Sequence, residues 1–110
     1  MTSRLIEDAE MEKALDFLRD NAKAIGEARA AMIKTDRMVK HILAIETLRA
    51  EGAAAIREAH ARASKVYLDA VTAEAVAAGR FEEMRALREA AAAKIECWRS
   101  EQATLRGMRV

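Results

Sequence analysis

Hydrophobic residues recur along the first half of the chain at alternating four- and three-residue intervals, a spacing typical of a heptad-like coiled-coil stripe. Arg29 and Asp36 interrupt it. Nothing between residues 7 and 50 forces a break, because Gly26 in a helix interior costs only about 1 kcal/mol relative to alanine. We therefore predict one helix over about 7–50. The apolar positions of the stripe are Met11, Leu15, Leu18, Ala22, Ile25, Met32, Val39 and Leu43.

A second helical region is expected after the Ala50-Glu51-Gly52 segment, since glycine readily adopts the left-handed conformation that ends helices. Residues 53–63 are rich in alanine and predict a short connecting helix. Ser64 is a suitable N-cap for a last helix over about 65–106. We prefer one continuous last helix to two helices divided at Gly79.

These elements predict an all-α fold with one domain over residues 1–110, a long antiparallel helical hairpin that is coiled-coil-like and has a short helical connector. A helix of about 40 residues is ~60 Å long and must pack along another long helix. In the last helix the residues on or near the apolar side are Tyr67, Leu68, Val71, Val76, Phe81, Met84, Leu87, Ala91, Ile95, Trp98, Gln102 and Leu105.

The amino-acid composition supports the all-α fold and indicates the oligomeric state and cellular compartment to expect. The 110 residues include no proline, which suits long helices. A chain this short leaves much of its surface exposed as a monomer, so we expect a homodimer. The net charge is +1 and no long block of like charge occurs, so charge alone indicates no partner. Cys97 is the only cysteine, and the sequence has no signal-peptide pattern and no membrane-spanning run. We therefore expect the protein to be cytoplasmic.

Residues for catalysis, cofactor binding or metal binding are not arranged in any recognisable site. His41 and His60 are too far apart for one helical face and have no cysteine nearby. Glu82 and Glu83 are adjacent and diverge by roughly 100° around a helix, so they form no acid/base pair. We therefore expect a non-enzymatic protein without a cofactor.

Four arginines flank the apolar side of the last helix, and two interpretations of them are open. They can form a phosphate-binding strip for nucleic acid, or they can cover the seam with their stems and pair with acids. The second is favoured because Glu96 and Arg99, and Arg85 and Glu89, have the spacing of helical ion pairs. The four are Arg85, Arg88, Arg99 and Arg106.

Trp98 is the only tryptophan and occupies a seam position. Tryptophan is enriched among interface hot spots, so an interface or core role is favoured over base stacking. A smaller basic group lies at the connector and marks a second place where nucleic acid can bind. It consists of Arg57, His60, Arg62 and Lys65.

The C-terminal segment Ile95-Glu96-Cys97-Trp98-Arg99-Ser100-Glu101-Gln102-Ala103-Thr104 resembles the I-E-V-W-R-T-x-x-A-T ending of a family of small uncharacterised helical proteins from tailed phages and prophages. Phe81-Glu82-Glu83-Met84-Arg85 resembles the Y-E-x-L-R of the same family. This chain departs from the family at Lys65, where relatives commonly carry proline, and at Cys97, where they carry an aliphatic residue.

The resemblance implies a phage setting, since genes of this family often lie near recombination and single-strand-annealing genes. It implies no mechanism. We expect an accessory protein that binds protein or nucleic acid in phage DNA recombination or replication. The alternatives are an inhibitor of a host protein, such as an anti-CRISPR-like protein, and a structural coiled-coil module.

Overall fold

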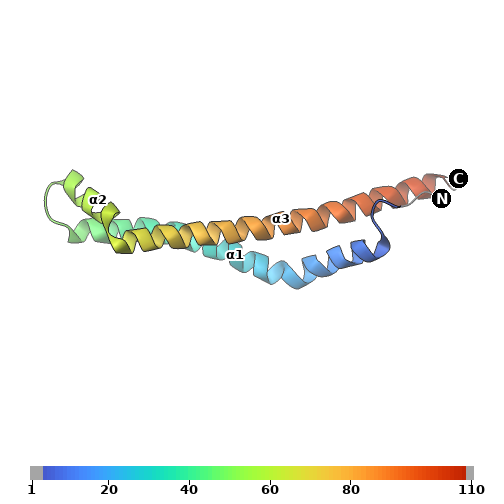
Figure 1. Ribbon diagram of the computed structural model, residues 1–110, viewed down its shortest axis with the longest axis horizontal. Coiled ribbons are helices and arrows are strands. Elements are labelled where there is room, and N and C mark those ends of the chain that lie inside the picture. Colours follow the sequence, from blue (N-terminus) through green and yellow to red (C-terminus); the bar gives the residue numbers. More distant parts are fainter. Residues whose placement is uncertain (1–3, 109–110) are drawn as a thin grey trace. The chain divides into compact units, whose positions relative to one another are not determined.

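The computed structural model describes residues 4–108, and over that range the chain is all-α. Helix α1 spans Asp8–Arg49, α2 spans Ala54–Ala63 and α3 spans Lys65–Met108 (Figure 1). The predicted all-α helical hairpin with a short helical connector is confirmed. Helix α3 runs through Gly79 without a break, as the sequence analysis preferred.

The chain divides into two compact units, each containing parts of α1 and α3. In the first, residues 4–25 pack with residues 83–108. The start of α1 lies beside the end of α3 there, because Trp98 donates a hydrogen bond to Asp8 and the Leu5 amide donates one to Glu101. The two helices are therefore antiparallel within this unit.

Eleven residues of α1 follow an uninterrupted heptad spacing of alternating three- and four-residue steps. Every one of them is buried or half-buried. Large and small side chains alternate along much of this seam, an arrangement that lets two helices approach closely. The positions are Met11, Ala14, Leu18, Asn21 and Ile25 in the first unit, and Ala28, Met32, Thr35, Val39, Ile42 and Glu46 in the second.

Helix α3 contributes a matching heptad seam. Its positions are Tyr67, Ala70, Glu74, Ala77 and Phe81 in the second unit, and Met84, Arg88, Ala91, Ile95, Trp98, Gln102 and Leu105 in the first. All are buried or half-buried except Arg88, whose side chain is exposed. The polar members of the seam show that helix spacing, and not hydrophobicity alone, selects the contact positions.

The predicted stripe of α1 is wrong by one residue at several places. Leu15 and Ala22 are exposed, and Ala14 and Asn21 hold the seam positions instead. Arg29 and Asp36 are also exposed, beside the seam residues Ala28 and Thr35, so they do not interrupt the seam. The predicted stripe relied on bulky side chains, whereas close helix packing here uses small ones.

The connector begins and ends at residues whose local chemistry explains the breaks. Gly52 has a φ of +111°, a conformation that L side chains rarely adopt, so the chain can turn there after α1. At the other end the Ser64 Oγ accepts a hydrogen bond from the Tyr67 amide at 3.2 Å and donates one to the Ala61 carbonyl at 2.7 Å. Ser64 is thus the N-cap of α3, as predicted.

Candidate interaction surfaces

Trp98 lies on the α3 seam and is fixed by a polar contact at the start of α1. Its Nε1 donates a hydrogen bond to the Asp8 Oδ1 at 2.8 Å, and Arg4 pairs with the same oxygen at 2.7 Å. The indole is half-buried. The N–H group of Trp98 is therefore already used within the chain, and its ring contributes to the seam between α1 and α3.

The Glu101 carboxylate lies one helical turn beyond Trp98 and joins the same end of the hairpin. Its Oε2 accepts the hydrogen bond from the Leu5 amide at 2.8 Å. Its Oε1 is buried and has no hydrogen-bond partner among the described residues. This contact connects the backbone that precedes α1 to α3.

Three of the four candidate arginines lie on one row of α3. Arg85, Arg99 and Arg106 are separated by multiples of seven residues, so they occupy the same heptad position beside the seam. Arg88 instead lies at a seam position with an exposed side chain. The structure thus brings three of these residues onto one flank and places the fourth apart from them.

Acidic neighbours neutralise part of this charge, as the sequence spacing predicted. The Arg85 Nε lies 3.1 Å from the Glu89 Oε1, and the Arg99 Nη1 lies 3.0 Å from the Glu96 Oε1. Within residues 4–108, Arg88 and Arg106 have no ion pair or side-chain hydrogen bond. The free positive charge of the flank is therefore small.

An open depression on the surface of α3 adjoins Trp98 and two of these arginines. Its floor and walls come from a single helix, so no second element encloses a ligand there. The lining residues are Glu96, Trp98, Arg99, Ser100, Gln102, Ala103 and Arg106.

The connector end of the hairpin forms a second surface, which we call the connector groove. It lies between the end of α1 and the start of α2, and its apolar side chains include Leu48, which is 79% exposed. The groove is lined by Lys40, Leu43, Ala44, Thr47, Leu48, Ala54, Arg57 and Glu58. Of the candidate interaction residues predicted from sequence, Arg57 is the one that lies here.

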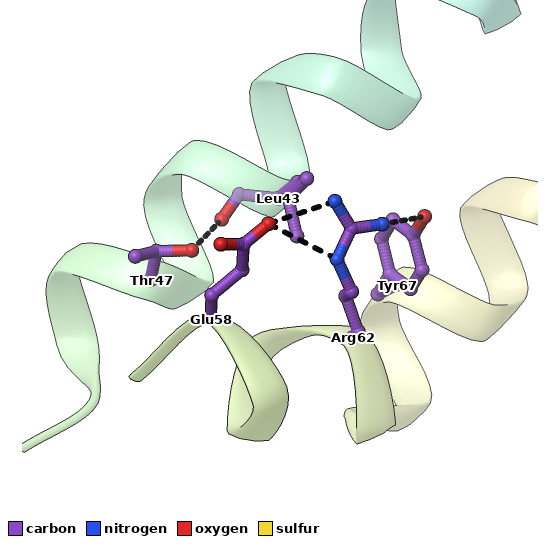
Figure 2. Close-up of polar contacts among 5 residues, drawn as sticks. All are labelled: Leu43, Thr47, Glu58, Arg62 and Tyr67. Carbon is purple, nitrogen blue, oxygen red and sulfur yellow. Dashed lines mark hydrogen bonds and ion pairs between the residues drawn. The ribbon is translucent and has the colours of Figure 1, made fainter. Parts of the chain in front are cut away.

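Arg57 is half-buried in this groove, and its Nε is buried without a hydrogen-bond partner among residues 4–108. Next to it, the Glu58 Oε1 accepts hydrogen bonds from the Arg62 Nη2 at 2.8 Å and Nε at 3.2 Å (Figure 2). The hydrogen bond with Glu58 and its negative charge raise the pKa of the Arg62 guanidinium. Arg62 therefore remains charged and holds Glu58 in place.

Arg62 also ties α2 to α3, because its Nη1 lies 3.4 Å from the Tyr67 hydroxyl oxygen (Figure 2). Two members of the predicted basic group at the connector thus have different roles. Arg62 is engaged with an acid and a tyrosine, and Arg57 lines the groove.

A third surface, which was not predicted from the sequence, is a groove in the first unit that we call the α1–α3 groove. Its apolar residues are Ala14, Phe17, Leu87, Ala90 and Ala91, and its charged residues are Glu10, Lys13 and Lys94. Leu87 was assigned to the seam, but it is 46% exposed. In the sequence, the only indication of this groove was a second row of apolar residues that flanks the heptad seam.

Residues 4–108 contain no group of three or more histidine, cysteine or acidic side chains that can hold a metal ion. No helix in that range is both long and apolar enough to cross a bilayer.

Comparison of the chain with protein-family models, with curated proteins and with solved structures gave no match.

Proposed function

We propose that this chain is a non-enzymatic accessory protein of a phage or prophage, and that it works by binding a partner protein in phage DNA recombination or replication. The observation that carries the binding role is the distribution of apolar side chains. Only five described residues are buried, and four of them are alanines. Twelve large hydrophobic side chains between residues 4 and 108 are at least 39% exposed.

These exposed side chains leave apolar surface that a protein partner can cover, and such surface marks an interaction site where it is contiguous. The connector groove fits such a partner best. Leu48 supplies an exposed apolar anchor, and charged groups of both signs, including Arg57 and Glu58, lie around it. This combination of an apolar centre and a polar rim is typical of protein interfaces.

Affinity capture from phage-infected cells tests the proposal with a matched pair of variants. Leu48→Glu puts a charge into the connector groove, whereas Val76→Glu changes a side chain on α3 that is 68% exposed and outside the groove. We expect the wild type and Val76→Glu to retain the same partner in stoichiometric amount, and Leu48→Glu to lose it. Equal capture by all three proteins would contradict a role for this groove.

The identity of the captured protein separates the proposed setting from its alternative. A phage recombination or replication protein supports the proposal. A host nuclease or CRISPR effector would instead support inhibition of a host defence protein, a role for which the small size of the chain is equally suitable.

Direct contact with nucleic acid is a second candidate, because Arg88 and Arg106 carry charges without acidic partners among residues 4–108. Fluorescence anisotropy with labelled single- and double-stranded DNA at low salt tests it. Binding that weakens as salt rises supports contact with phosphates. No binding to either form at low salt would leave only the protein partner.

A further inference from the structure

We infer that the α1–α3 groove is the surface on which a second copy of this chain docks, so that the protein is a homodimer built through its first unit. The groove lies between residues 10–17 of α1 and residues 87–94 of α3. This interface is separate from the connector groove, which belongs to the second unit.

The exposed area of the chain leaves a large surface available to a second copy. The accessible surface is 8246 Å² for a chain of 12.2 kDa, whereas a compact monomer of this mass exposes about 6,100 Å². The excess is roughly 2,100 Å², and a stable dimer buries only about 800 Å² on each partner. Self-association therefore has more than enough surface available.

The floor of the groove suits a helix from a second copy. Ala14, Ala90 and Ala91 are small, so they allow a neighbouring helix to approach closely. Phe17 and Leu87 stand beside them, and Leu87 is 46% exposed. Burial of these two side chains removes apolar area from water and supplies the driving force for association.

The charges around this floor are self-complementary, which favours a second copy over an unrelated protein. Glu10 is an acid, and Lys13 and Lys94 are bases. Within residues 4–108 none of the three side chains has an ion pair or hydrogen bond. In a two-fold dimer each surface meets its own equivalent, so Glu10 of one copy can face Lys13 or Lys94 of the other.

Sedimentation equilibrium of the full chain across a dilution series tests the inference. The wild type is expected to have twice the mass of the chain. Leu87→Glu is expected to weaken dimerisation by more than about a hundredfold, because an unpaired carboxylate would be buried at the interface. Val76→Glu, the matched change outside the groove, is expected to remain dimeric.

Charge reversal provides a second readout that leaves the apolar floor intact. Glu10→Lys and Lys94→Glu are each expected to weaken the dimer, and the two changes together are expected to restore it. Circular dichroism of each variant confirms that the helices form. A wild type that stays monomeric into the millimolar range, or a Leu87→Glu protein as dimeric as the wild type, would overturn the inference.

Binding of the partner protein and dimerisation can be lost independently of each other. Leu48→Glu is expected to lose the partner protein and remain a dimer, whereas Leu87→Glu is expected to become a monomer. A monomeric wild type that captures a phage or host protein through the connector groove would reject the dimer and keep the binding role.

Discussion

One hydrogen bond joins Trp98, near the end of the chain, to Asp8, near its beginning. The seam placement of Trp98 was predictable, because the residue follows the heptad spacing of the last helix. Its contact with Asp8 was not, since the pairing of two residues 90 positions apart depends on how α1 and α3 are aligned. Sequence periodicity defines the face of each helix but not their relative alignment.

Removal of the Asp8 carboxylate is expected to loosen this end of the hairpin. Asp8→Ala removes the acceptor for both the Trp98 Nε1 and Arg4, so we expect a loss of about 1 kcal/mol in the free energy of unfolding. Since Trp98 is the only tryptophan, its fluorescence emission should also shift to the red. Urea denaturation followed by tryptophan emission measures both effects.

The control is Asp20→Ala, which removes an exposed carboxylate that pairs with Arg19 at 3.0 Å. Exposed ion pairs contribute little and alanine is the better helix former, so this change should leave the emission unaltered and should not lower the unfolding midpoint. Identical behaviour of the two variants would show that the Asp8–Trp98 contact does not hold the end of the hairpin.

Helix ends were the part of the fold most accessible from sequence. Gly52 and Ser64 were identified by their residue types, and the structure assigns them a left-handed turn and an N-cap. The seam of α1 was less accessible. Leu15 looked like a seam residue because it is large and apolar, yet Ala14 is the one that is buried.

Alanine substitutions at the glycines should have opposite effects at the turn and within the helices. Gly52→Ala places a Cβ on a backbone with φ of +111°, a conformation that L side chains rarely adopt, so we expect destabilisation of about 1 kcal/mol. Gly26→Ala and Gly79→Ala have open space around the new Cβ and should stabilise their helices by up to about 1 kcal/mol. Thermal unfolding followed at 222 nm measures the differences.

Stabilisation by Gly52→Ala would contradict the assigned turn geometry. Destabilisation by Gly79→Ala would contradict a continuous α3.

The Ser64 cap gives a second prediction at the scale of the helices. Ser64→Ala removes the acceptor of the Tyr67 amide hydrogen bond and should cost about 1 kcal/mol of stability in urea denaturation. Ser100→Ala, within α3, caps no helix end and should be neutral or slightly stabilising because alanine is the better helix former. An equal loss in both variants would argue against the cap.

At the scale of the whole molecule, the arginine flank carries too little free charge to dominate binding. Arg85 and Arg99 are paired with acids, and the α3 row is sparse, with Arg99 and Arg106 about 10 Å apart along the helix. A duplex presents one charge per about 1.7 Å, so few phosphates are neutralised.

Any DNA affinity should therefore depend only modestly on salt, with a slope of log K against log salt no steeper than about −4 for the four arginines. Anisotropy titrations at several salt concentrations measure this slope. A much steeper slope would show that a larger basic surface binds DNA and that this assessment of the flank is wrong.

The exposed surfaces were the part of the molecule least predictable from sequence. The amphipathic pattern showed that apolar residues flank the seam, but which of them stay exposed depends on the register and closeness of the packed helices. Leu48 and Leu87 became interface candidates only when the structure placed them in grooves beside charged residues.

The central claim is that the protein acts through complexes, as a dimer that binds a partner protein. Native mass spectrometry of the chain purified from phage-infected cells tests both parts in one spectrum. The account predicts a complex that contains two copies of the chain together with a second protein. A bare monomer of 12.2 kDa, with neither a second copy nor a partner, would contradict it.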